Sequence, residues 1–190
     1  MRAFIAIEIT AEIKGFLAGL QKELRKSNAD ISWVKPNNIH ITMRFLGEIQ
    51  PAQQNILAEI LDTALRRHSP FKLRVSSLGA FPNTKSPRVI WTGIDLGTEQ
   101  LQKISGELEA AIHTAGFPGE ERPFTAHLTL GRTKSSLNRS LLAKIIGDLN
   151  QRFEEEKPEM TVSKVTLFKS TLTPGGPVYE ALHIANLATT

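Results

Sequence analysis

The chain has 190 residues, a formal net charge of +4 and a sequence pI of about 9.5. Its length suits one domain with enough interior to fold alone, and the mild basic charge is compatible with a polyanionic ligand without selecting one. It contains no cysteine, which excludes a disulfide framework, a thiolate nucleophile and a cysteine-based zinc site. A reducing compartment, the cytoplasm, is therefore the expected location.

The amino-terminal segment predicts a strand followed by a helix. Phe4 to Ile9 is a short apolar run rich in isoleucine. It is too short for a secretory core and far from the ~20 residues of a membrane span, so no membrane association is expected. Thr10 is a candidate helix cap, and the apolar residues after it have helical spacing: Ile13, Phe16, Leu17, Leu20 and Leu24.

The rest of the chain alternates between the two kinds of element. A strand around His40 precedes a helix that starts near Pro51. The further predicted elements are, in order, strands Phe71–Leu78 and Arg88–Ile94, a helix from Thr98 to about Ala115 that Gly116 ends, a strand around His127, a helix from about Asn138 to Phe153, and strands Met160–Ser170 and Val178–Ile184 joined by a turn at 174–177.

The order of elements reflects an internal repeat. His40-Ile-Thr-Met recurs as His127-Leu-Thr-Leu, 87 residues later (127 − 40 = 87), and the segment at Val75 recurs at Val162 with the same offset. The pseudo-repeats span approximately residues 3–86 and 88–186. We expect a single bilobal domain over 1–190 of the α+β class, with two pseudo-symmetric lobes, each an antiparallel-rich sheet with two helices, and an active-site cleft between them.

Strand geometry predicts which side chains share a face. Residues two apart point the same way, so His40, Thr42 and Arg44 are expected to project together, as are His127 and Thr129. Arg132 lies at an odd step from His127, and a bend or bulge at Gly131 would be needed to turn it back toward the same face.

Two histidines and two threonines suit chemistry at a phosphodiester. Near neutral pH one imidazole can accept a proton while the other donates one. Each threonine hydroxyl can donate a hydrogen bond to a non-bridging oxygen. The sequence has no His-Glu-x-x-His, no aspartate-rich loop and no Gly-x-x-x-x-Gly-Lys loop, so neither a metal nor a cofactor is expected.

These motifs resemble the two-histidine phosphoesterase superfamily, and within it the RNA 2′,3′-cyclic phosphodiesterases, also called the 2′-5′ RNA ligase family. The likeness extends from Met1 to Tyr179. Besides the two motifs, the segments that support it are Trp33-Val34-Lys35-Pro36, Phe45-Leu46-Gly47-Glu48 and the run Arg122 to Arg132 around the second motif.

The resemblance implies metal-independent hydrolysis of RNA 2′,3′-cyclic phosphate ends to 2′-phosphates, with reversible, ATP-independent 2′-5′ ligation. It implies His40 and His127 as the acid and base, and Thr42 and Thr129 as phosphate ligands. Which histidine is the acid stays open at the level of sequence, and we assign that role to His40 and the role of base to His127. Arg132 matches a family position that contacts phosphate, and Arg44 is a weaker candidate for the same role. The expected partners are RNA with cyclic ends, such as tRNA fragments, and the expected state is a monomer.

Two alternatives stay open at the level of sequence. One keeps the histidine pair but changes the substrate to a small cyclic nucleotide or a 2′-5′ oligonucleotide. The other is a non-catalytic RNA-binding module. Such a module needs basic and stacking residues, not paired imidazoles, so the matched motifs count against it.

Overall fold

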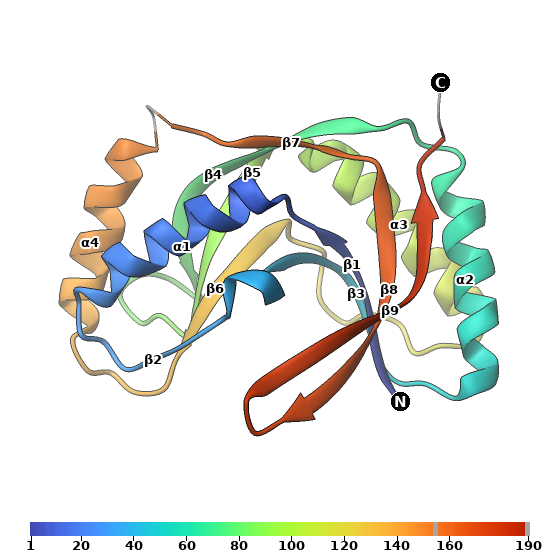
Figure 1. The fold of residues 1–190 in the computed structure, drawn as a ribbon, viewed down its shortest axis with the longest axis horizontal. Helices are drawn as coiled ribbons and strands as arrows, with labels where there is room; N and C mark the ends of the chain where they lie inside the picture. Colours follow the sequence, from blue (N-terminus) through green and yellow to red (C-terminus); the bar gives the residue numbers. More distant parts are fainter. Residues whose placement is uncertain (154–155, 189–190) are drawn as a thin grey trace.

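The computed structural model describes residues 1–153 and 156–188 and consists of two antiparallel sheets, each with two helices (Figure 1). Sheet A has the strand order β3-β1-β8-β9, and sheet B has the order β2-β6-β5-β4-β7. The strands are β1 (Arg2–Glu8), β2 (Ile31–Trp33), β3 (His40–Glu48), β4 (Phe71–Phe81), β5 (Val89–Leu96), β6 (His127–Thr133), β7 (Glu159–Val162), β8 (Lys164–Thr173) and β9 (Gly176–Asn186). The helices are α1 (Ala11–Arg25), α2 (Pro51–Leu65), α3 (Thr98–Thr114) and α4 (Arg139–Arg152), with a short 3-10 turn η1 (Pro36–Asn38).

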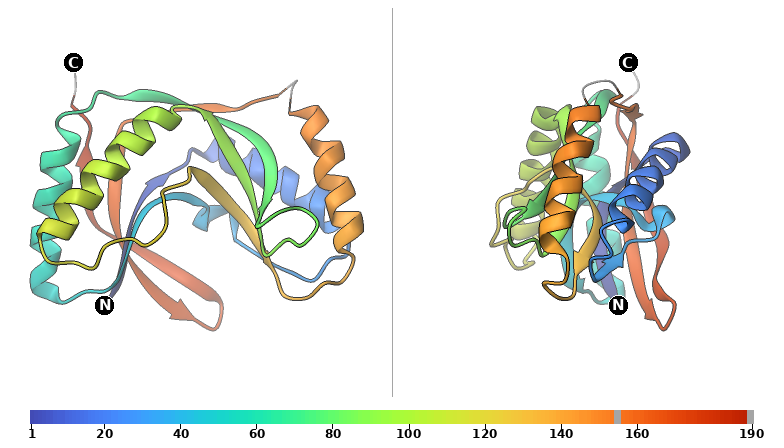
Figure 2. Two further views of the ribbon diagram at one scale, coloured as in Figure 1. Left: turned by 180° about the vertical axis from the view of Figure 1, so that it is seen from behind. Right: turned by 90° about the vertical axis from the view of Figure 1, so that its left-hand side faces the viewer.

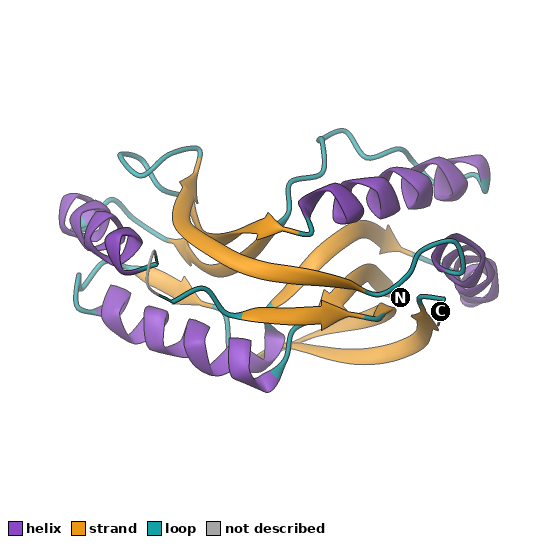
Figure 3. Ribbon diagram, turned by 90° about the horizontal axis from the view of Figure 1, so that it is seen from above, coloured by secondary structure: helices purple, strands orange, loops and turns teal. Residues whose placement is uncertain are grey.

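The helices lie on the outer sides of the molecule and the sheets between them (Figure 3). Helices α2 and α3 contact each other and sheet A, whereas α1 and α4 contact each other and α4 contacts β4 of sheet B. The expected fold, two lobes that each combine an antiparallel sheet with two helices, is confirmed. None of the described helices is long and apolar enough to cross a membrane.

The lobes do not coincide with the two halves of the chain. Sheet A takes β1 and β3 from the first half and β8 and β9 from the second, and sheet B is mixed in the same way. The view from behind in Figure 2 shows the early and late segments of the chain side by side in both lobes. Each lobe likewise has one helix from each half, so the two repeats interleave.

Two details of the predicted elements are corrected. The single strand expected over Met160–Ser170 is two strands, because the chain passes at Ser163 from β7 in sheet B to β8 in sheet A. Strand β2 was not among the predicted elements. It has only three residues, which is too short for a recognisable alternation.

Helix boundaries follow local chemistry. The Thr10 hydroxyl accepts a hydrogen bond from the Ile13 amide at 3.4 Å and caps α1. Pro51 is the first residue of α2, and Gly116, with φ of 89°, follows α3 in the left-handed conformation that glycine adopts at low cost. These three predicted boundary signals are confirmed.

The two faces of sheet A carry different residues. Ile5, Ile7, Ile41 and Met43 are buried in the main core. Phe4, Ala6 and Phe168 form a separate buried cluster with Tyr179 packed against it. The face that carries this second cluster is called the aromatic face below.

Candidate active site

His40 is the first residue of β3, and a backbone carbonyl and two aromatic rings contact its imidazole. Its Nδ1 lies 2.8 Å from the Asn38 carbonyl oxygen, so in the neutral ring Nδ1 carries the proton and Nε2 is free to accept one. The ring packs on Phe4 (centroids 4.9 Å apart) and against the edge of Tyr179 (5.4 Å). In the register of the sheet His40 lies opposite Glu8 and Thr42 opposite Ala6, so both side chains lie on the aromatic face.

His127 repeats this arrangement at the start of β6. Its Nδ1 lies 2.7 Å from the Thr125 carbonyl oxygen, which again leaves Nε2 free. Phe81 meets the His127 ring edge-on, with centroids 5.2 Å apart, and its own ring lies tilted against Trp91 at 5.0 Å. Thr129 lies opposite Trp91 and His127 opposite Gly93, so Thr129 and His127 share a face of sheet B.

The two histidines belong to opposite sheets, and β3 and β6 contact each other between the lobes. Burial lowers the pKa of both rings, since it disfavours the charged imidazolium. The hydrogen bonds to the two carbonyls oppose this effect. The charge of His127 lowers the pKa of His40 further, and Arg132 does the same to His127.

A β-bulge follows each threonine. On β3, Ala6 faces Thr42 but Ile5 faces Arg44, so Met43 is an extra residue. The corresponding bulge on β6 places Leu130 as the extra residue, since Trp91 faces Thr129 and Ile90 faces Gly131.

The bulge on β6 reverses the parity of the residues beyond it, so Arg132 shares the face of His127 and Thr129. The conditional prediction that a bulge at Gly131 would turn Arg132 toward the site agrees with this register. The charge of Arg132 reaches the site, because it acts on the pKa of both His127 and Tyr179. Phe45 occupies the equivalent place on β3 (132 − 45 = 87).

Arg44 is placed differently from the sequence prediction. The bulge at Met43 turns it to the opposite face of β3, beside Ile5, where its side chain is 8% exposed. Its Nε lies 2.5 Å from Glu109 Oε2 of α3, and Nη1 lies 3.3 Å from Glu120 Oε2. Nη2 donates to the Pro118 carbonyl. The prediction that Arg44 shares the face of Thr42 is wrong, and this side chain instead ties β3 to the segment after α3.

The comparisons with known proteins identify the family of the chain. A family model described as LigT-like phosphoesterase matches the chain twice, over residues 7–91 and 94–179. The chain belongs to the LigT-like phosphoesterase family. A curated relative from Methanothermobacter thermautotrophicus, named RNA 2′,3′-cyclic phosphodiesterase, is 32% identical over 98% of this chain and 99% of its own length. A Methanocaldococcus jannaschii protein of the same name is 36% identical over 96% and 98%.

Solved structures share the fold of this LigT-like phosphoesterase. A crystal structure of a Thermus thermophilus protein superposes with a TM-score of 0.80 at 26% identity, with 98% of each chain covered. Escherichia coli LigT complexed with 3′-AMP superposes with a TM-score of 0.78 at 23% identity, over 99% of this chain and 98% of that one.

Several site residues of this LigT-like phosphoesterase escaped the sequence prediction. Phe4 and Tyr179 contact His40, and Phe81 contacts His127. Burial raises the pKa of Tyr179, and the charges of Arg2 and Arg132 oppose that rise. The repeat contained a signal for the aromatic residues, because Phe4 and Trp91 share the offset of 87, as do Phe81 and Phe168.

Two sets of hydrogen bonds position the histidine strands. The buried Gln21 of α1 donates through Nε2 to the carbonyls of Leu130 (2.9 Å) and Val34 (2.8 Å), and so joins the β6 bulge to the segment that leads to His40. Asn38 Nδ2 donates to the Pro177 carbonyl at 2.8 Å, which connects the same segment to β9. Among residues 1–153 and 156–188, no three His, Cys, Asp or Glu side chains are grouped as metal ligands.

Proposed function

We propose that this LigT-like phosphoesterase hydrolyses RNA 2′,3′-cyclic phosphate ends to 2′-phosphates without a metal ion, with His40 and His127 as the acid and base. The observation that carries the proposal is the matched pair of imidazoles from opposite sheets, each with Nδ1 on a backbone carbonyl. The names of the relatives from M. thermautotrophicus and M. jannaschii support the same activity.

The reaction needs one proton donor and one acceptor. A 2′-phosphate forms when water attacks phosphorus in line with the bond to O3′ and that bond breaks. In the proposed assignment His127 Nε2 takes the proton of the attacking water, while protonated His40 Nε2 gives its proton to the departing O3′. After one turnover His127 is charged and His40 is neutral, and exchange of one proton with solvent restores the starting state.

The phosphate itself would be bound by neutral and charged donors. Thr42 and Thr129 each lie two residues after a histidine, on the same face of its strand. Each hydroxyl can therefore donate a hydrogen bond to one non-bridging oxygen of the phosphate. Arg132 adds a positive charge that favours the developing dianion. The three groups bind the phosphate while the imidazoles move the protons.

Reversible ligation belongs to the same proposal. If a 5′-hydroxyl replaces water, the same two proton transfers join it to the 2′-phosphate without ATP, as O3′ leaves. By microscopic reversibility, the reverse sequence breaks the 2′-5′ linkage and restores the cyclic phosphate and the 5′-hydroxyl. tRNA fragments with cyclic ends are the proposed RNA for this step. The monomeric state and the cytoplasmic location stay predictions.

The decisive assay uses cytidine 2′,3′-cyclic monophosphate in the presence of EDTA. We expect turnover to cytidine 2′-monophosphate by the wild type and by His113→Ala, a control in the last turn of α3, and loss of turnover in His40→Ala and His127→Ala. A 3′-monophosphate product would refute the proposed leaving oxygen. RNA binding without turnover in the wild type would support the binding module instead.

A second substrate separates the acid from the base. An aryl phosphodiester has a leaving oxygen that needs no proton, so a variant that lacks only the acid keeps most of its activity on it. We expect His40→Ala to retain activity on this substrate and His127→Ala to lose it. The opposite pattern would exchange the two roles.

A further inference from the structure

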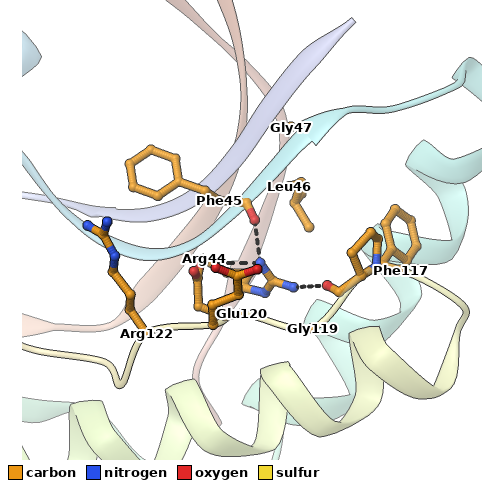
Figure 4. A pocket seen from close by; sticks show the side chains of 10 residues that line it. Arg44, Phe45, Leu46, Gly47, Phe117, Gly119, Glu120 and Arg122 are labelled. Carbon is orange, nitrogen blue, oxygen red and sulfur yellow. Dashed lines mark hydrogen bonds and ion pairs between the residues drawn. The ribbon is translucent and has the colours of Figure 1, made fainter.

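A pocket of about 330 Å³ separates the end of β3 from the segment that joins α3 to β6 (Figure 4). Residues 44–47 line one side of this pocket and residues 117–122 line the other. Side chains therefore do not fill the space between the strand and the segment. Figure 4 shows the Arg44 guanidinium between them, with polar contacts to both sides.

Arg44 uses all three nitrogens of its guanidinium group in this link. Nη1 donates to the Phe45 carbonyl of β3 at 2.6 Å, and Nη2 donates to the Pro118 carbonyl on the other side. Nε pairs with one carboxylate oxygen of Glu109 in α3, and the other oxygen accepts a hydrogen bond from the Glu120 amide at 2.8 Å. The Glu120 carboxylate lies 3.3 Å from Arg44 Nη1. The segment after α3 is thus held through both its backbone and a side chain.

This segment has few other contacts that fix its backbone. Residues 115–126 form no helix or strand. In the described part of the chain, no backbone–backbone hydrogen bond involves residues 118–126. Phe124 and Ala126 pack against the core at the end that leads into β6. The contacts of Arg44 and Glu109 therefore determine where the segment lies at its other end.

The same segment ends at the carbonyl that orients His127. The Thr125 carbonyl oxygen lies 2.7 Å from His127 Nδ1, and this contact leaves Nε2 free for the proton of the attacking water. The hydrogen bond also raises the pKa of His127, against the larger lowering by burial. A displacement of the segment would move this carbonyl and the ring that it holds.

His40 is held by contacts in which Arg44 takes no part. Its carbonyl partner, Asn38, is joined to β9 through the Pro177 carbonyl. Arg44 lies four residues after His40, and the bulge at Met43 turns it to the face of β3 opposite to the phosphate-binding threonine. Its side chain therefore points away from the substrate.

We propose that Arg44 is a positioning residue, which holds the segment after α3 against β3 and so sets the position of His127 relative to the strand that carries His40. The inference rests on the proposed function, in which His127 is the base. It makes the spacing of the two imidazoles depend on a polar bridge on the side of β3 that the substrate does not reach.

The first test measures hydrolysis of cytidine 2′,3′-cyclic monophosphate by Arg44→Met, well below its melting temperature. We expect kcat to fall about 10- to 100-fold, because a misplacement of up to 1 Å has an effect of this size. KM should stay within about threefold of the wild-type value, since no group that binds the phosphate is removed. Arg44→Lys keeps a charge beside Glu109 and should recover part of kcat.

Arg74→Met is the matched control. Arg74 also pairs with two carboxylates, those of Asp95 and Glu159, but all three residues belong to sheet B and none lies in the segment after α3. This variant should retain the wild-type kcat even if its melting temperature falls. Glu120→Ala removes one partner of Arg44 and gives a milder form of the same test if Arg44→Met does not fold.

The second test is an NMR titration of the histidine rings, with signals assigned from His40→Gln and His127→Gln. In folded Arg44→Met the pKa of His127 should fall below its wild-type value, because the hydrogen bond to Thr125 that raises it is weakened. The pKa of His40 should change little, because Asn38 keeps its own contact with β9.

An unchanged kcat in folded Arg44→Met would overturn the inference and leave the proposed function intact. A variant that loses activity through KM alone would place Arg44 in contact with the substrate, and a fall in kcat without any change in the pKa of His127 would assign the effect to a general loss of structure. Either result would also overturn the inference. Absence of turnover in the wild type would refute the proposed function, and the NMR titration would still decide whether Arg44 positions His127.

Discussion

The close approach of Gly131 to β2 makes Gly131→Ala the most informative single substitution in this fold. A Cβ at this position would lie 2.7 Å from Ile31 Cγ2, 3.1 Å from Trp33 Cε3 and 3.2 Å from the Ser32 carbonyl oxygen. The side-chain tip of Ile31 can move, but the Ser32 backbone is part of the β2–β6 ladder, so β6 must shift by a few tenths of an ångström. Overpacking of this kind costs ~1–3 kcal/mol.

This shift of β6 would displace the bulge at Leu130, which sets the face on which Arg132 lies. A misplacement of 1 Å can reduce a rate about 100-fold, so a few tenths of an ångström should lower kcat/KM roughly 3- to 10-fold. We expect the melting temperature to fall by about 2–4 °C per kcal/mol lost, as differential scanning calorimetry would measure.

Gly106→Ala is the matched control. Gly106 lies inside α3, and no atom lies within 4 Å of the added Cβ, so this change should stabilise the protein by ~0.5–1 kcal/mol and leave kcat/KM unchanged. If Gly131→Ala melts at the wild-type temperature and retains full activity, the contact between β2 and the bulge does not position Arg132.

Further predictions concern titration and the groups around the strands. Because burial lowers the pKa of both histidines, the bell-shaped profile of kcat/KM should have its maximum below pH 6.5, and a maximum above pH 7.5 would contradict the acid–base pair. The free energy of unfolding should fall as the pH drops from about 6.5 to the lowered pKa of His40, because in this range the unfolded chain binds a proton at His40 and the folded chain does not. In urea titrations at several pH values, His40→Gln should weaken this dependence. Arg44→Met should cost ~1–3 kcal/mol of stability, because the carboxylate of Glu109, whose side chain is 32% exposed, loses its partner. Arg132→Met should lower kcat/KM and its salt dependence with little change in melting temperature. Gln21→Met should cost ~2 kcal/mol and also lower kcat/KM, since the buried carbonyl of Leu130 and the partly buried carbonyl of Val34 lose their donor. Full activity in this variant would show that the link across the strands is not needed.

The sequence was sufficient for the features that depend on local pattern. Periodicity and capping residues predicted four helices close to their observed bounds, and the repeat of the His-x-Thr-x segment predicted two histidine strands in related places. The threonines follow their histidines on the same face because no irregularity separates them. Each of these features is set within a few residues of the chain.

The features that depend on pairing between distant segments were harder to predict. The bulges at Met43 and Leu130 move Arg44 out of the site and Arg132 into it, and one extra residue in a strand leaves no reliable mark in a hydrophobic pattern. Applied consistently, the offset of 87 residues would have equated Arg132 with Phe45 and Arg44 with Gly131, so the repeat was a better guide to these positions than strand parity. The assignment of β7 and β8 to different sheets also lies beyond local pattern, because Val162 and Val165 are equally buried on either side of the crossing.

The exchange of strands between the two halves of the chain determines how the molecule can come apart. Of the strand pairings in the described residues, a fragment that ends at residue 87 would retain only β1 with β3, because every other strand of the first half pairs with a strand from the second. Neither lobe can therefore unfold as an independent body while the other persists. The separation between the two imidazoles is consequently a property of the entire chain rather than of a hinge, and a single cooperative transition should abolish fold and activity at the same temperature.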